Sequence, residues 1–452
     1  MTLRALFFLV LVMPAQSWCG DLQSFRVPGS AFVPLNSATQ YEDAGAGCRY
    51  RVSGPETFAL DVQLPEGAMV SALRVFFEDR STLDLNVSLQ IGDGQGIALS
   101  LAEVSSSGIG GFGAEQAMLT PPLEIDRDLF VLLHASLPGT DEQLKLCGAE
   151  VQYMPPTDPP AVGHRMIPAA AFTAERNFTS WTDGDAGCSR FTSVVPPLAA
   201  VSAGVPPGSH IETLKLFYFD QNSSALGEIL LRLLEQDPQG PFINTLASVT
   251  SDQDTGFGTA MVTVDREAGD LPLYLDWSQA IRSSDLRLCG AQLIFSPAAG
   301  ARFDDRIAAA AFVPASSRAR FSFVSGCINH RGAGTPGRFI HPVHPPSGAS
   351  IVSMTGAFFD NDIDNNLTLS LLALDGQGGE TTLAEFVSAD EGSGTVNIDL
   401  PEPYLTNEQV ESYALVAELD DGESSTDLLF CSAGVEYLRP ALVFEDGFEA
   451  VL

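Results

Sequence analysis

The stretch LKLCGAEVQYMP, residues 144–155, returns twice more in the same chain with few changes. Its copies read LRLCGAQLIFSP at residues 286–297 and LLFCSAGVEYLRP at residues 428–440. Other landmarks recur in one order at intervals of about 140 residues, namely Phe32, Phe172 and Phe312, then Gly67, Gly208 and Gly348, then Asp79, Asp220 and Asp360. A unit of this length is the size of a whole domain, so the chain contains three copies of one module.

Each copy carries the sequence signature of β-strands. Runs such as SALRVFFED (71–79), LDLNVSLQI (83–91) and ETLKLFYFD (212–220) are rich in leucine, aromatic and β-branched residues and are bounded by Gly, Pro, Asp and Asn. Helical periodicity over long windows is scarce. The pattern predicts an all-β protein made of three tandem antiparallel β-sandwich domains of jelly-roll type, each with one disulfide inside the domain.

The repeat also sets the expected boundaries. We place the three sandwich domains at residues 24–155, 164–297 and 304–440, preceded by a signal peptide at 1–20 and followed by an acidic tail at 441–452. The proline-rich segment PPTDPPAVG, residues 155–163, is typical of a linker, and proline stiffens such joints. The domains are therefore expected to be held apart semi-rigidly.

The cysteines divide evenly among the copies. Of the seven cysteines, Cys19 lies at the signal-peptide boundary, and the other six divide two per copy. Each copy has one early cysteine after a glycine-containing turn and one late cysteine in the closing strand, which predicts the pairs Cys48–Cys147, Cys188–Cys289 and Cys327–Cys431. The alternative of metal-binding or catalytic thiols lacks any C-x-x-C pair and would place the thiols on apolar strands.

The closing strand is expected to cover a core on one side. Strict alternation puts Cys147, Ala149, Val151 and Tyr153 on one apolar face, and the other two copies repeat this arrangement. Glu150 and its counterparts then face solvent.

Charge and the N-terminus indicate the compartment. The chain has 57 Asp and Glu against 23 Lys and Arg, a net charge of −34, which repels nucleic acid and anionic membranes. The first residues, MTLRALFFLVLVMPAQSWCG, have the charged, apolar and small-residue regions of a cleaved secretory signal peptide. No later stretch is long and apolar enough for a transmembrane helix. We therefore expect a secreted or extracellular protein.

One acidic cluster has the chemistry of a cation site. The third copy continues past its strand as DNDIDNN, residues 360–366, in which Asp360, Asp362 and Asp364 alternate as in calcium-binding loops. The EF-hand pattern is not met, because Asn365 and Leu371 stand where glycine and glutamate are required. Asp and Asn also form turns through their own side chains. Calcium is thus one hypothesis, a turn is the other, and no other cofactor is expected.

The third copy alone is rich in histidine. The segment CINHRGAGTPGRFIHPVHPP, residues 327–346, contains His330, His341 and His344, which are capable of metal binding or acid–base catalysis. On an extended strand residues three apart point to opposite faces, and Pro342 prevents a helix, so a polar loop is the competing interpretation. The chain has no G-x-S-x-G or H-E-x-x-H motif.

The module resembles a repeated β-sandwich unit of exported bacterial proteins that have no assigned activity. The resemblance is carried by a PxxAF start, a central LPxGAxVxxLxxxFxD and a closing CxAxVxY, and by a short DGFE ending within VFEDGFEAVL. It implies no catalytic residue. The ending is either a sorting tag or a frayed acidic end.

These observations lead to two functional hypotheses. The first is a non-enzymatic protein with a structural, adhesive, glycan-binding or protein-binding role, in which loops at the sandwich ends carry recognition. The second is a secreted hydrolase with a site in the third copy around His330, His341, His344 and Asp360. Convergence of these side chains in space would distinguish them.

Overall fold

The structure is a computed structural model, and it describes residues 22–438 apart from short gaps. The gaps are residues 95–97, 108–109, 157–161, 175–180, 184–187, 193–197, 223–226, 237–242, 253–255, 280–282, 284, 298–302, 325–326, 331–336, 346–347, 363, 378, 389–391, 408–409 and 421–426. The expected signal peptide at 1–20 and acidic tail at 441–452 lie outside the described residues, as does most of the expected linker.

The first repeat forms two antiparallel sheets. Its elements are β1 (Gln23–Pro28), the 3-10 helix η1 (Gly29–Ala31), β2 (Val33–Pro34), β3 (Gln40–Gly45), β4 (Cys48–Ser53), β5 (Thr57–Val62), β6 (Met69–Asp79), β7 (Asn86–Gly92), β8 (Ala98–Ser105), β9 (Gly111–Glu124), β10 (Phe130–Ser136) and β11 (Leu144–Met154). A six-stranded sheet has the order β3-β4-β11-β6-β9, with β1 also paired to β11. A five-stranded sheet has the order β2-β5-β10-β7-β8.

The second repeat has the same topology. Its elements are β12 (Gly163–Pro168), η2 (Ala169–Ala171), β13 (Thr173–Ala174), β14 (Trp181–Asp183), β15 (Ser189–Phe191), β16 (Leu198–Ser202), β17 (His210–Asp220), β18 (Ile229–Gln236), β19 (Ile243–Thr250), β20 (Gly256–Glu267), β21 (Leu273–Gln279) and β22 (Leu286–Ser296). Its sheets run β14-β15-β22-β17-β20, with β12 on β22, and β13-β16-β21-β18-β19.

The third repeat completes the set. Its elements are β23 (Phe303–Ala308), η3 (Ala309–Ala311), β24 (Val313–Pro314), β25 (Phe321–Val324), β26 (Cys327–His330), β27 (Gly337–Val343), β28 (Ser350–Asp360), β29 (Leu367–Leu374), β30 (Glu380–Val387), β31 (Gly392–Leu405), β32 (Ser412–Leu419) and β33 (Leu428–Leu438). Its sheets run β25-β26-β33-β28-β31, with β23 on β33, and β24-β27-β32-β29-β30. In each repeat the apolar sides of the two sheets enclose one core, to which Val75 and Leu133 belong in the first.

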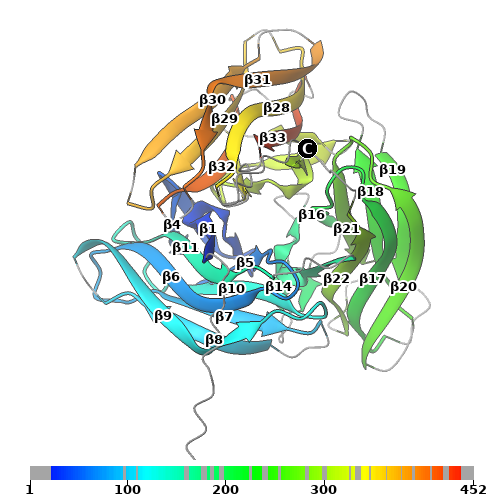
Figure 1. Cartoon of the computed structure of the whole chain (residues 1–452), viewed down its shortest axis with the longest axis horizontal. Helices are drawn as coiled ribbons and strands as arrows, with labels where there is room; N and C mark the ends of the chain where they lie inside the picture. The colour runs from blue at the N-terminus through cyan, green and yellow to red at the C-terminus, as the bar shows by residue number, and fades with distance from the viewer. Residues whose placement is uncertain are drawn as a thin grey trace, which may run out of the picture.

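The fold is all-β, as predicted, but the prediction of three tandem β-sandwich domains is wrong. The six sheets are arranged as a single six-bladed β-propeller, and the three repeats close a ring around one axis (Figure 1). Alternation along a strand shows that one face is apolar but cannot show what covers the other face. Here the second faces of the inner strands pack against neighbouring repeats, while the outer strands such as β8 and β9 keep an exposed face.

Contacts between the repeats follow one rule around the ring. The five-stranded sheet of each repeat packs on the six-stranded sheet of the next. Phe130 and Leu132 contact the second repeat's Phe217 in one buried cluster, and in another Ala200, Leu234 and Tyr274 contact Ala308 and Ala310 of the third repeat. The ring closes where the Tyr41 hydroxyl donates to the Pro314 carbonyl at 3.3 Å. The repeats are therefore not separate beads.

The closing strands also depart from strict alternation. In the pairing of β11 with β6 the register shifts between Leu146 and Gly148, so Cys147 sits in a β-bulge. Leu146 and Ala149 then both face the core, while Cys147 packs with Cys48 and Phe76 on the opposite side. The expectation that Cys147 shares a face with Ala149 is therefore wrong, because the bulge inserts one residue. The same shift occurs at both other closing strands.

The disulfide prediction is confirmed. The bonds are Cys48–Cys147, Cys188–Cys289 and Cys327–Cys431, each within one repeat. Each joins the closing strand to the segment that contains the early cysteine of the same repeat. The bonds are consistent with an extracellular, oxidising compartment. Within the described ranges, no helix has the length and apolar character to cross a membrane.

Candidate functional site

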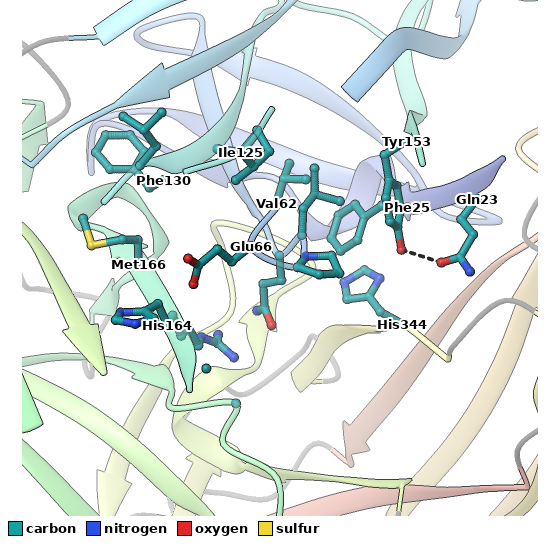
Figure 2. Close-up of a pocket in the computed structure, with 18 of the residues that line it drawn as sticks. Gln23, Phe25, Val62, Glu66, Ile125, Phe130, Tyr153, His164, Met166 and His344 are labelled. Carbon is teal, nitrogen blue, oxygen red and sulfur yellow. Dashed lines mark hydrogen bonds between the residues drawn. The ribbon is translucent and has the colours of Figure 1, made fainter. Parts of the chain in front are cut away.

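A cavity of about 510 Å³ lies at the axis, where all three repeats meet. The first strands β1 and β12 supply part of its wall, and the segment after β5, residues 62–66, supplies another part. The third repeat contributes His344, Glu411 and Tyr413. Side chains from distant parts of the sequence thus line one space, which Figure 2 shows in close-up.

Aromatic rings form one side of this axial cavity. Phe25 stacks on His344 across the boundary between the first and third repeats, with ring centroids 4.1 Å apart. Beside them the Tyr153 hydroxyl donates to Gln23 Oε1 at 3.1 Å (Figure 2). Phe130 lies at the far end of the cavity beside Met166 (Figure 2).

Strand pairing explains why these side chains gather at the axis. The first strand of every repeat pairs with its closing strand, so Gln23 lies opposite Tyr153 and Phe25 opposite Val151. In the second repeat the corresponding strand places Arg165 opposite Leu293. Residues of β1 and β12 line this cavity, and residues of β23 line a smaller cavity beside it.

A second cavity of about 240 Å³ adjoins the first, because Gln63, Arg165, Gly204 and His344 line both. The Arg165 guanidinium donates through Nη2 to the Ser202 carbonyl at 3.2 Å. It also occupies the space that a Cβ on Gly204 would need, and Gly204 has a φ of +56°. Glycine is therefore required where the arginine crosses the axis.

The Arg165 side chain lies beside a buried acid. Its Nη2 is 4.0 Å from Asp61 Oδ2, and both side chains are 9% exposed. Burial raises the pKa of Asp61 to about 7, although the Arg165 charge opposes this rise. Burial likewise lowers the pKa of Arg165. The centre of the ring thus contains a buried contact between Arg165 and Asp61 that bridges the first and second repeats.

His341 and His344 are both brought to this region. His341 Nδ1 is 3.0 Å from the Ala311 carbonyl oxygen, and burial lowers the pKa of His341 to about 4. Burial lowers the pKa of His344 to about 3, and the nearby His341 and Arg165 add to the effect. Both rings are therefore neutral at pH 7.

The other residues of the hydrolase hypothesis lie elsewhere. His330 is buried at the end of β26, and Asp360 is buried at the end of β28. Neither belongs to the lining of the axial cavity or of the adjoining one. The four side chains thus fail to converge as that hypothesis requires.

The Asp360 cluster forms a turn. Asp360 Oδ1 accepts the Asp362 N–H at 3.0 Å, and Oδ2 accepts the Ser388 hydroxyl. Asp362 Oδ1 in turn accepts the Asp364 N–H at 3.1 Å. No group of three or more His, Cys, Asp or Glu side chains suited to a metal ion occurs among the residues that the structure describes. Calcium at this turn stays a prediction, and no geometry in the described residues supports it.

Apart from His341 and His344, sequence reasoning missed the axial residues. At equivalent register positions the first strands carry Phe25, Arg165 and Asp305, opposite Val151, Leu293 and Val435. A strict repeat would carry similar residues there. This break in the repeat is the signal that could have identified the axis as a specialised region.

Comparisons with known proteins identify no family. No family model and no curated protein sequence matches the chain. A tandem pair of CBM22 domains from Paenibacillus barcinonensis Xyn10C is 11% identical over 61% of this chain and 98% of that chain, with a TM-score of 0.24. An isomalto-dextranase of Arthrobacter globiformis complexed with panose is 14% identical over 53% of this chain and 36% of its own, with a TM-score of 0.24. A triple jelly-roll protein of an archaeal virus is 13% identical over 91% and 94%, with a TM-score of 0.21. At such scores these likenesses support no functional conclusion.

Proposed function

We propose that this protein is a secreted, non-enzymatic glycan-binding protein that holds a short glycan segment in the axial cavity. The observation that carries the proposal is the combination of aromatic rings and hydrogen-bonding side chains that all three repeats direct at one space. Cavities of a few hundred Å³ with mostly apolar walls and a few placed polar groups are typical of small-ligand sites.

The wall chemistry matches the two kinds of surface on a sugar. A sugar ring has an apolar face of C–H groups, which packs on aromatic rings, and Phe25, His344 and Tyr153 supply such rings. Its edge carries hydroxyls that both donate and accept hydrogen bonds. Gln63 and Glu66 line the same cavity and offer amide and carboxylate groups for these hydroxyls.

Secretion is part of the proposal. The disulfides favour an oxidising compartment, and the first residues have the pattern of a signal peptide. Glycans on cell surfaces or in the medium would be accessible there.

The test is direct binding by the purified full-length chain. A glycan array selects candidates, and isothermal titration calorimetry then measures Kd for each hit with wild type and with Gln63→Ala. We expect the substitution to weaken binding about three- to tenfold, the effect of one lost hydrogen bond. Gln116→Ala is the matched control, because Gln116 lies exposed on β9 outside the cavity lining.

Two outcomes would contradict the proposal. One is the absence of any glycan ligand, and the other is a glycan whose Kd is unchanged by Gln63→Ala and by a second cavity variant, His344→Ala. Release of new reducing ends from a bound glycan would instead favour the hydrolase hypothesis.

A further inference from the structure

The residue that each repeat places against the preceding repeat differs among the three copies. On the six-stranded sheets, Phe76 lies opposite Gly148 in the first repeat and Phe217 opposite Gly290 in the second. At the equivalent position of the third repeat Ala357 lies opposite Ser432. Two copies therefore place a phenyl ring between the repeats, and the third places a methyl group there.

The phenyl rings make the same contacts in both copies. Phe76 packs on the Cys48–Cys147 disulfide, and Phe217 packs on Cys188–Cys289. Each phenyl ring also contacts the repeat that precedes its own around the propeller. A Cβ on Gly376 would come within 3.4 Å of Phe76, and one on Gly94 within 2.8 Å of Phe217. The space between neighbouring repeats is thus shaped for an aromatic ring.

In the third repeat a cavity of about 350 Å³ lies at this boundary, lined by Ala357, Gly356 and Ser432. Ala357 packs on the Cys327–Cys431 disulfide, and Gln236 of the second repeat covers part of the disulfide, with its Nε2 3.6 Å from Cys327 Sγ. Pro272 of the second repeat lies on the other side. The volume lies in the range of small-molecule sites.

The third repeat has an arginine beside the position where the other repeats have a phenyl ring. In the first repeat the Arg26 guanidinium carbon lies 4.0 Å from the centroid of the Phe76 ring, a cation–π contact. Arg306 is the register equivalent of Arg26, since Arg26 lies opposite Glu150 and Arg306 opposite Gly434. Arg306 lines the cavity, and its Nη2 lies 3.7 Å from Oδ1 of the exposed Asp270. The third repeat thus keeps the cation of this pair and lacks the ring.

We propose that the cavity between the second and third repeats binds a small aromatic molecule, whose ring takes the place that Phe76 and Phe217 fill in the other repeats. The ring lies against Ala357 and beside Arg306. Thr395 and Asn397, which also line the cavity, bind a polar substituent such as a phenol hydroxyl or an indole N–H. This site is separate from the axial cavity and does not depend on the glycan proposal.

The experiment compares indole and phenol as probes, with glucose as a non-aromatic control, in calorimetric titrations of the full chain. Wild type is expected to bind indole or phenol with a Kd of about 1 mM or below. Ala357→Phe supplies the ring that the other repeats carry, so it should abolish this binding and raise Tm. Arg306→Gln should weaken binding about threefold or more. Arg318→Gln is the matched control, because Arg318 is an exposed arginine at a different boundary between repeats.

The possible results either support this site or overturn it. Loss of aromatic binding in an Ala357→Phe variant that still folds, as its Tm shows, supports the site. Absence of binding to wild type overturns it, as does binding that persists in Ala357→Phe or a cavity that takes glucose in preference to indole. If Ala357→Phe does not fold, Arg306→Gln decides, and an unchanged Kd in that variant overturns the proposal.

Discussion

Phe25 near the start of the chain stacks on His344 of the third repeat, so one aromatic pair joins the beginning of the ring to its end. Phe25 belongs to the core of the first repeat, and His344 lines the axial cavity. The pair therefore belongs both to the interface that closes the ring and to the candidate ligand site. A substitution of Phe25 or His344 is expected to alter both the stability of the fold and the binding of a ligand in the axial cavity.

Replacing His344 with alanine should lower the free energy of unfolding by about 1–3 kcal/mol, because it removes a stacked ring and leaves a gap against Phe25. Urea denaturation followed by tryptophan fluorescence measures the change. His210→Ala is the control, since the His210 side chain is 49% exposed and its partner Asp265 is more exposed still. Equal effects of the two substitutions would contradict a structural role for the stacked pair.

Acidification below pH 6.5 should lower stability through His341 and His344, and the single carboxyl of Asp61, whose folded pKa of about 7 is raised, opposes part of this loss. The pKa values of His341 and His344 are about 4 and about 3 in the folded chain, against an ordinary value near 6.5, so between these values the unfolded chain binds more protons. Each histidine then contributes a loss of up to about 1.4 kcal/mol per pH unit, and this loss is absent above about pH 6.5.

The same denaturation series at pH 7.5, 6 and 5 tests this assignment. The difference in unfolding free energy between wild type and His344→Ala should narrow as the pH falls, because the variant no longer has to keep that ring neutral. A difference that stays constant from pH 7.5 to pH 5 would show that His344 is not held neutral by the fold.

Local patterns made part of the fold predictable from sequence. The period of the landmarks identified three equivalent units, and the even division of cysteines identified their pairing, because both signals are repeated within the chain. Strand positions followed from runs of apolar residues between turn formers. These features depend on neighbouring residues and on the repeat alone.

Packing between the repeats was not predictable in this way. Glu150 follows the solvent-facing pattern of its strand, yet it is 1% exposed and accepts a hydrogen bond from the Ser24 hydroxyl at 2.8 Å. Gln292, its counterpart, is fully buried and donates to the Arg127 carbonyl of the first repeat at 2.8 Å. A buried polar residue that has a hydrogen-bond partner shows the same sequence pattern as one that faces water, so most residues of the axial cavity could not be identified from sequence.

Ser388→Ala should destabilise the third repeat by about 1–3 kcal/mol. The Ser388 hydroxyl donates to buried Asp360 and accepts the Leu367 N–H at 2.8 Å, so its removal leaves two buried polar groups without this partner. Ser370→Ala is the control, because the Ser370 hydroxyl makes an exposed contact with Glu385.

Melting with and without EDTA in the same samples tests the calcium hypothesis, which predicts a lower Tm in EDTA for wild type.

Removal of one disulfide tests whether the ring unfolds as a unit. The Cys327–Cys431 bond spans 104 residues, and its loss in the double variant Cys327→Ala, Cys431→Ala should lower the free energy of unfolding by about 2–5 kcal/mol. Because each repeat packs on both neighbours, the loss should shift one common transition in calorimetry instead of splitting off a single repeat. Two transitions, of which the earlier covers about a third of the enthalpy, would show that the third repeat unfolds independently and that the contacts between repeats are weak.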